Sequence, residues 1–175
     1  MEPIINIKIE ADTDINTFIL MWNPSISSYT MERFETDLAD MANGGFLDGF
    51  NWSVWEHTKA KEGDHFFMVK VGPGSNGIVM CGIFTSDPYI SEDWSSKGRV
   101  VHYMDMDVDL IIHPDKCPLL SAEILSKEIP DFTWDKGHSG QLLSHEQASK
   151  LKQMWEKYLE DNSDIFKPRA AKIGN

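Results

Sequence analysis

Residues 65–85 read HFFMVKVGPGSNGIVMCGIFT. Two runs rich in aromatic and β-branched residues flank a turn of glycine, proline, serine and asparagine, a composition typical of a β-hairpin. The turn lacks the Gly-Lys-Ser/Thr ending of a phosphate-binding loop and joins two strands rather than a strand and a helix. The sequence therefore predicts strands from His65 to Val71 and from Ile78 to Thr85.

Further strands are predicted on both sides of this hairpin. The mostly apolar run from Asn16 to Trp22 predicts a buried strand, which ends at Asn23-Pro24 because proline cannot donate a ladder hydrogen bond. A short segment from Phe50 to Trp55 precedes the hairpin. From His102 to Ile112 apolar residues alternate with three aspartates, the period-two pattern of a half-exposed strand.

Spacing and capping signals predict three helices. From Thr30 to Met41 apolar residues recur every three or four positions, and Gly44-Gly45 follows as a natural stop. Residues 121–127 are expected to form a short helix. Ser144 and Gln147 match a capping box, and the apolar stripe after them predicts a last helix that packs on the sheet.

The length and composition predict one domain. A chain of 175 residues with 41% hydrophobic content can bury one sizeable core. We expect this domain to span 16–160, with an N-terminal extension at 1–15 and a mobile tail at 161–175. No secretion signal and no apolar run long enough for a membrane span is found, so we expect a soluble, cytoplasmic protein without a membrane partner. In that compartment Cys81 and Cys117 are expected to be free thiols.

Charge and aromatic content bear on function. The formal net charge is −12, with 28 acidic against 16 basic residues. Non-specific binding of nucleic acid depends on neutralising phosphates, so this charge argues against strong binding of that kind. Six tryptophans, nine phenylalanines and four tyrosines are a high aromatic load for an acidic domain of this size. Most of these rings must fill the core, but some could line a pocket.

No catalytic or metal-binding motif is complete. The segment from Gly137 to Gln141 suggests a nucleophile elbow, but glutamine stands where that motif needs its second glycine. The aspartates 105, 107 and 109 lack the glycine of a calcium loop, and strand alternation already explains their spacing. The six histidines show no zinc-ligand spacing. We therefore expect a protein that is not an enzyme and that uses no metal and no cofactor.

An ordered series of short motifs carries a family resemblance. The series consists of Phe18 to Pro24, Gly45-Phe46, Trp52-Ser53, Gly63-Asp64, Gly77 to Gly82, Ser86 to Tyr89, Trp94, Ser139-Gly140 and a last helix ending near Trp155. Together these motifs resemble the EVE-like domain of the PUA-like superfamily, which is found at the N-terminus of HNH-type endonucleases and in modification-dependent restriction systems and is related to YTH domains. The resemblance spans residues 16–159.

The resemblance implies an α+β fold, a small curved mixed β-barrel flanked by helices, with a pocket for an extruded modified base. A flipped base presents two π faces and one hydrogen-bonding edge, so its reader needs aromatic walls and a few fixed polar groups. The residues that we place around the pocket are Trp22, Asn23, Trp52, Ser53, Ser86, Pro88, Trp134, Ser139 and Gly140. Of these, Ser139 and Gly140 are expected to close the pocket and to offer a backbone amide.

Some of these rings also have a purely structural interpretation. Trp22 follows Phe18 and Leu20 on one side of its strand and could belong to the core. Trp134 could cap the core, and Trp55 is a weaker candidate than Trp52. Gly77 and Gly82 are expected to serve the turn and close strand contact rather than a ligand.

The sequence also departs from the family pattern. It contains no HNH motif, so any cleavage would require a partner such as a nuclease or another effector protein, and it lacks the basic stripe of a DNA reader. The main hypothesis is a non-catalytic module that recognises a modified nucleobase in DNA or RNA. The alternatives are a binder of a free nucleobase-like ligand and an acidic protein–protein interaction module.

Overall fold

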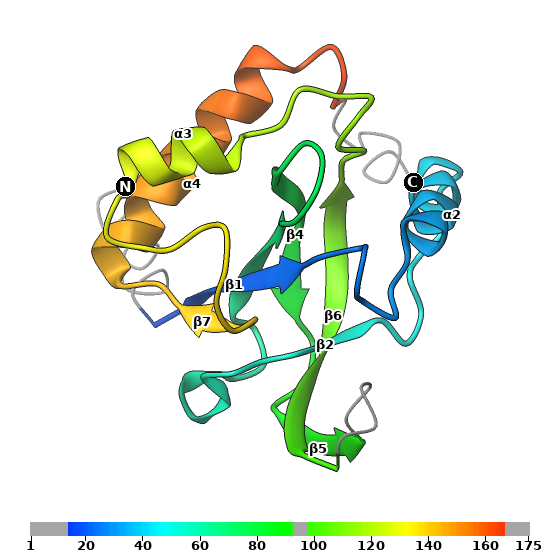
Figure 1. Ribbon diagram of the computed structural model, residues 1–175, viewed down its shortest axis with the longest axis vertical. Coiled ribbons are helices and arrows are strands. Elements are labelled where there is room, and N and C mark those ends of the chain that lie inside the picture. The colour runs from blue at the N-terminus through cyan, green and yellow to red at the C-terminus, as the bar shows by residue number, and fades with distance from the viewer. Residues whose placement is uncertain (1–13, 93–97, 167–175) are drawn as a thin grey trace, which may run out of the picture.

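A single curled sheet organises the protein. The computed structural model describes residues 14–92 and 98–166, and within them seven strands run in the order β2-β6-β4-β3-β1-β7, with β5 paired to β6 (Figure 1). The strands are β1 (Thr17–Trp22), β2 (Asn51–Ser53), β3 (His65–Lys70), β4 (Gly77–Phe84), β5 (Tyr89–Glu92), β6 (Val100–Ile111) and β7 (Gln141–Leu142). The predicted hairpin is confirmed as the antiparallel pair β3–β4.

Strand β1 lies between β3 and the short strand β7. It pairs in parallel with β3 and antiparallel with the short β7, which makes the sheet mixed. All six of its residues are buried, because both faces of the sheet are covered at this point. Double coverage explains why the sequence here is a continuous apolar run rather than an alternating one.

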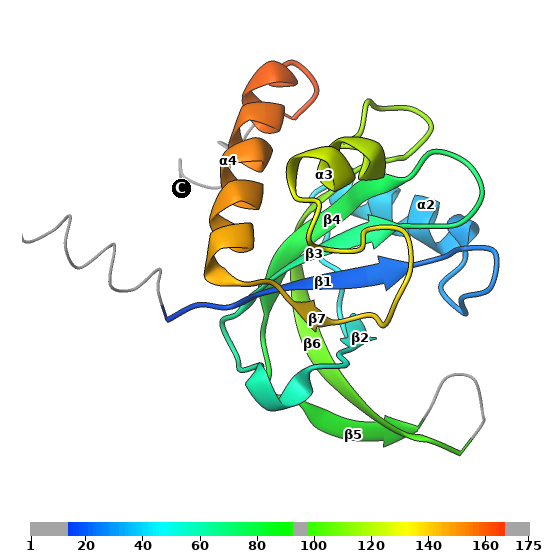
Figure 2. The ribbon, with the colours of Figure 1, turned by 60° about the vertical axis from the view of Figure 1, so that its left-hand side comes forward.

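The long strand β6 bends the sheet into a half-barrel. Its second half, Met106 to Ile111, pairs with β4, whereas its first half pairs with β2 and β5 (Figure 2). A register shift between Cys81 and Gly82 marks an irregularity of the kind that increases strand bending. A Cβ atom added at Gly82 would lie 2.0 Å from the Asp107 carbonyl oxygen, so the strands approach closely only because this residue is glycine, as predicted.

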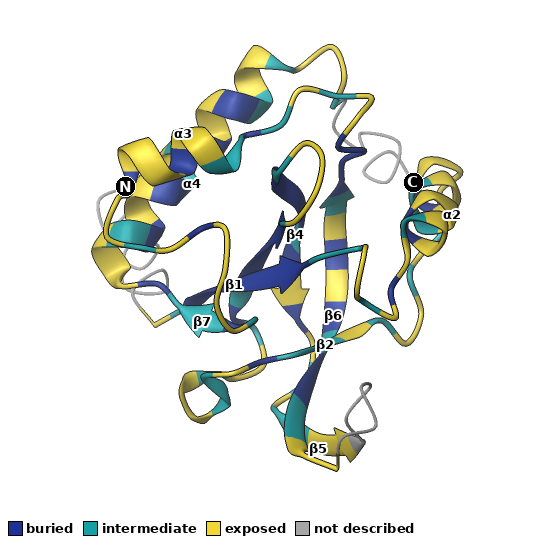
Figure 3. Ribbon diagram, in the orientation of Figure 1, coloured by how far each residue is buried: buried dark blue, intermediate teal, exposed yellow. Residues whose placement is uncertain are grey.

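Helices cover the two faces of the sheet. The helices are α2 (Met31–Ala42), α3 (Ala122–Glu128), α4 (His145–Asp161) and the single 3-10 turn η1 (His57–Lys59). Phe34 of α2 joins the core cluster that contains Phe18, Leu20 and Trp22, and α3 and α4 contribute to the opposite cluster that contains Ile19 and Met21. Figure 3 shows the buried strands between these helices, whose outward sides are exposed.

The predicted α+β class with a curved mixed sheet is confirmed. The Ser144 capping box is also confirmed, since its hydroxyl accepts from the Gln147 amide while the Gln147 side chain accepts from the Ser144 amide. Strands β5 and β7, which are four and two residues long, were not predicted. No helix in the described segments is long and apolar enough to cross a membrane.

Only parts of the predicted terminal segments fall within the structure. Residues 1–13 of the extension and 167–175 of the tail lie outside the described residues, as does Trp94. In the described part of the tail, the Phe166 ring lies 5.7 Å from the Tyr158 ring of α4. The chain therefore continues to pack on the domain just beyond the predicted boundary at 160.

The contact at Gly82 yields a stability prediction. Gly82→Ala forces the new methyl group against the Asp107 carbonyl and the Phe66 ring, and we expect the free energy of unfolding to fall by about 2–3 kcal/mol. The exposed neighbour Ile83 is 37% accessible, so Ile83→Ala should cost less than about 1 kcal/mol. Urea unfolding followed by circular dichroism measures both changes, and equal losses in the two variants would contradict the close-contact role of Gly82.

Candidate functional site

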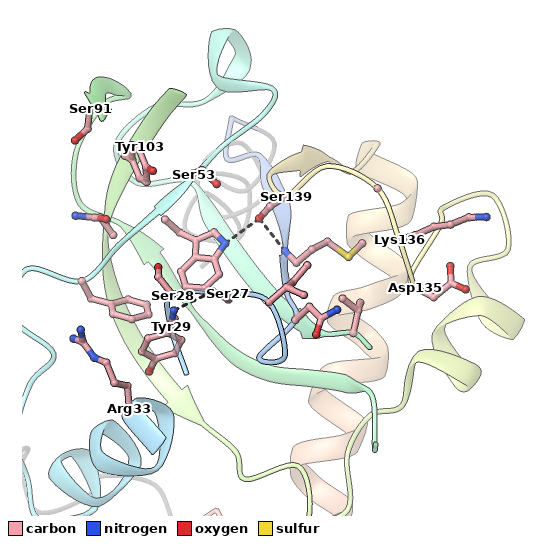
Figure 4. A pocket seen from close by; sticks show the side chains of 18 of the residues that line it. Ser27, Ser28, Tyr29, Arg33, Ser53, Ser91, Tyr103, Asp135, Lys136 and Ser139 are labelled. Carbon is pink, nitrogen blue, oxygen red and sulfur yellow. Dashed lines mark hydrogen bonds between the residues drawn. The ribbon is translucent and has the colours of Figure 1, made fainter. Parts of the chain in front are cut away.

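A cavity of about 640 Å³ opens beside strand β2. Separate parts of the chain build its walls: the end of β1 and the loop after it, the start of α2, strand β2 and the residues before it, the residue after β3, the β5–β6 pair and the loop before β7. Figure 4 shows Tyr29 and Arg33 at one side of this cavity, Asp135 and Lys136 at the other, and Ser139 between them. Segments far apart in the sequence thus converge on one concave site.

Aromatic rings form one wall of the cavity. The Trp52 indole is half-buried, and Tyr29 meets it edge-on, with ring centroids 5.7 Å apart and planes at 88°. Phe50 lies 6.1 Å from Trp52 and 5.3 Å from Tyr29. Tyr103 of β6 also lines the cavity. Edge-on packing fixes the Trp52 ring without covering its whole surface, which leaves aromatic surface accessible from the cavity.

The Ser139 hydroxyl fixes the position of Trp52. Its oxygen accepts a hydrogen bond from the Trp52 indole nitrogen at 3.0 Å and another from the backbone amide of Met21 at 2.9 Å (Figure 4). One atom thereby joins the end of β1 to a ring on β2. The sequence pointed to Ser139 as a residue that closes the pocket, and its actual contact is with the pocket wall.

Trp22 lies in the core and contacts Tyr29, a residue of the cavity wall. Its indole is completely buried and stacks on Phe34 with centroids 4.8 Å apart. Its ring nitrogen donates to the Tyr29 carbonyl oxygen at 2.7 Å. The Tyr29 hydroxyl donates to Asp37 at 2.5 Å, and burial followed by this hydrogen bond raises the pKa of Tyr29. Tyr29 therefore stays uncharged at neutral pH and is held at both its backbone and its hydroxyl.

Polar groups surround the opening. The Asn23 side-chain oxygen accepts from the amide and the hydroxyl of Ser25, which leaves its amide nitrogen without a partner among residues 14–92 and 98–166. The charged residues that line the cavity are Arg33, Lys136 and Asp135. Among the described residues, two cations and one carboxylate give the lining of this site a positive balance in a chain whose formal net charge is −12. Such a site suits a ligand that carries a negative group.

The structure brings four of the nine predicted site residues to the cavity, namely Asn23, Trp52, Ser53 and Ser139. The buried Trp22 does not line it. Trp134 is 1% exposed and donates to the Ile129 carbonyl in the core under α3 and α4, so the prediction of a pocket role for its ring does not fit its burial.

The remaining predicted residues have other contacts. Ser86 accepts a hydrogen bond from the Asp105 amide, and neither Ser86 nor Pro88 is among the residues that line the cavity. The Gly140 amide donates to the Ile19 carbonyl at 2.8 Å, so it is not the free amide that the sequence suggested. Gly140 instead lets the loop approach Val54, whose Cα a Cβ atom at Gly140 would meet at 2.4 Å.

Several lining residues were not predicted. Phe50 and Tyr103 lie in or next to predicted strands, and Tyr29 and Arg33 flank the Thr30 N-cap of α2. The signal available for Tyr29 was its place between a strand end and a helix start, where loop residues of a sheet edge commonly meet ligands. The described residues contain no group of three His, Cys, Asp or Glu side chains that could hold a metal ion.

Comparison with known proteins supports the fold. No protein-family model matches the chain, and no curated protein matches it. Among solved structures, a hypothetical protein from Leishmania major shares 14% identity at a TM-score of 0.51, covering 83% of this chain and 98% of that one. The Mmi1 YTH domain shares 12% identity at 0.46, covering 83% and 98%, and a complex of the YTH domain-containing protein Mmi1 with RNA shares 14% at 0.47, covering 84% and 85%.

The Ser139 contact yields a second prediction. Ser139→Ala leaves the Met21 amide and the Trp52 ring nitrogen without their acceptor, and we expect a loss of about 1–3 kcal/mol in the free energy of unfolding. Tryptophan fluorescence should also change, because the Trp52 ring loses its anchor. Ser28→Ala, at an exposed serine of the same cavity, is the control. If both variants unfold at the same urea concentration, the anchoring role of Ser139 is wrong.

Proposed function

We propose that this chain is a non-catalytic binding domain whose cavity holds one modified nucleobase of a nucleic acid against the Trp52 ring. The observation that carries the proposal is a half-buried indole, fixed by the Ser139 hydroxyl, in the wall of a cavity of about 640 Å³. A flat heterocycle gains from stacking on such a ring, and sites for small ligands commonly fall in this range of volume.

The polar groups of the cavity match the needs of a base. The Asn23 amide nitrogen can donate to a ring nitrogen or a carbonyl oxygen on the base edge, and the Ser53 hydroxyl lines the same space. Arg33 and Lys136 lie at the sides of the cavity, where a sugar-phosphate backbone would pass. The EVE-like motifs of the sequence support the same interpretation. We propose residues 16–160 as the binding unit.

Contacts around Ser139 support binding rather than catalysis. The hydroxyl accepts two N–H hydrogen bonds, and the neighbouring His138 ring stacks on Trp55 instead of pairing with that hydroxyl. A serine nucleophile needs a base within hydrogen-bond reach of its oxygen. Burial raises the pKa of the Cys81 thiol to about 12, so this thiol stays protonated at neutral pH. Any cleavage or other effector activity would then belong to a cytoplasmic partner protein.

A binding panel tests the proposal. Short single- and double-stranded DNA and RNA, each with a central methylated or unmethylated base, are titrated at low salt with tryptophan fluorescence as the readout. We expect a methylated single strand to bind best and Trp52→Ala to weaken it by roughly 5- to 150-fold, the equivalent of one lost base–aromatic stack. Trp52→Phe should retain part of the affinity because it keeps a ring.

The matched control is Ile124→Ala, at a 46% exposed residue of α3 that does not line this cavity. It should bind like the unmodified protein. Equal binding across the panel, or no binding at all, would reject base recognition. Binding of a free methylated nucleoside as tightly as of the strand would instead favour the free-ligand alternative.

The salt dependence of binding gives a further prediction. If Arg33 and Lys136 each neutralise one phosphate, these two contacts should together contribute about −1.4 to the slope of log K against log salt for a single strand. Arg33→Gln combined with Lys136→Gln should make that slope less negative by about 1.4 while the preference for the methylated base persists. A slope that the double variant leaves unchanged would contradict the placement of the backbone at these two residues.

A further inference from the structure

A second cavity adjoins the first. Its volume is about 340 Å³, and Ser53 and Ser139 line both cavities, so the two share a wall. The second cavity lies on the side of Trp55, beyond the end of β2. A strand that leaves the first cavity across this wall would pass directly over the second.

Two pairs of stacked flat rings line the second cavity. Trp55 and His138 stack with centroids 3.6 Å apart and planes at 5°, and His57 and His102 stack at 3.5 Å and 6°. These spacings leave no room for a third ring inside either pair. Only the outer faces of the pairs are available to a ligand. Trp55 is 59% exposed, so its indole presents open aromatic surface to the cavity side of the domain.

The backbone holds these rings in place. The amide of Trp55 donates to the Ser139 carbonyl at 2.9 Å, and the amide of Glu56 donates to the Gly140 carbonyl at 3.0 Å. The amide of Val54 donates to the His102 carbonyl, also at 2.9 Å. The segment that carries Trp55 is therefore fixed between the loop before β7 and strand β6. The ring platform exists before any ligand arrives, which lowers the entropic cost of binding.

The charge of this second cavity differs from that of the whole chain. Among the lining residues that the structure describes, the ionisable ones are Arg99 and three histidines, His57, His102 and His138. The chain as a whole carries 28 acidic residues. A locally basic hollow with stacked rings and an exposed apolar side chain, Val100 at 72%, matches a ligand that combines a flat base with a phosphate.

We infer that the second cavity binds the base next to the one held at Trp52, so that the domain contacts two consecutive nucleotides of a single strand. The neighbouring base stacks on the Trp55–His138 pair, and its phosphate lies towards Arg99. This inference rests on the proposed function of the first cavity. It adds a second contact site, with Trp55 as its main contact, which explains why a large indole is left exposed next to a base-sized cavity.

A double-mutant cycle on protein and strand tests the inference. The probes are three single strands with the same central methylated base: a complete strand, one with an abasic position on the 5′ side and one with an abasic position on the 3′ side. Each is titrated with the unmodified protein and with Trp55→Ala. We expect Trp55→Ala to weaken the complete strand about tenfold and to leave one of the two abasic strands unchanged, because the base that it would lose is already absent.

Trp55→Phe and Trp52→Ala separate the possible outcomes. Trp55→Phe should restore most of the affinity for the complete strand, and Trp52→Ala should weaken all three strands. If Trp55→Ala weakens the complete and both abasic strands equally, or if the unmodified protein binds all three equally, the second site is overturned while the first stands. If no strand binds, or Trp52→Ala has no effect on any, the proposed function fails and the inference fails with it.

Discussion

The Ser139 hydroxyl is the contact on which the rest of the site depends. Strand β7 is only two residues long and pairs with Phe18 and Ile19, so the Met21 amide lies beyond its reach. Ser139 supplies the missing acceptor, and the same oxygen holds the Trp52 ring nitrogen. A buried amide without a hydrogen-bond partner costs free energy, so the Met21 amide needs the Ser139 oxygen. The same oxygen orients Trp52, and the two contacts therefore depend on each other. The position of a ring on β2 is thereby tied to the most buried strand of the sheet.

The short loop around Ser139 also explains why two cavities lie side by side. Its backbone groups bond to Ile19 on one side and to Trp55 and Glu56 on the other. Gly140 has a φ of 89° and leaves no space for a Cβ atom beside Val54, so only glycine allows the loop to sit this deep between the two segments. The loop is thus a shared wall, and a shift of either neighbouring segment would change the shape of both cavities.

The sequence predicted the fold better than the site. Hydrophobic period, turn composition and capping located the helices α2, α3 and α4 and the strands β1, β2, β3, β4 and β6, because these are local signals. The parallel pairing of β1 with β3 and the short strand β7 depend on long-range contacts and carry no local signal. For the same reason Trp22 and Trp52 looked alike in sequence, although one fills the core and the other lines a cavity. Trp22 is buried because it stacks on Phe34 of α2. The spacing of residues in the sequence does not predict where α2 packs on the sheet.

The acidic charge of the chain and the two cavities fit together in one physical picture. A net charge of −12 is expected to repel nucleic acid at long range, which would weaken non-specific binding and slow the encounter. Under the proposed function, affinity would then come from short-range contacts such as stacking on Trp52, which only a base that has left its own stack can make. The cations Arg33 and Lys136 line the same cavity and would pair with a phosphate of that proposed ligand. Long-range repulsion of the nucleic acid, combined with local attraction of one extruded base, would favour selectivity over affinity. A nucleic acid without the right base would be repelled by the net charge and would gain no stacking on Trp52.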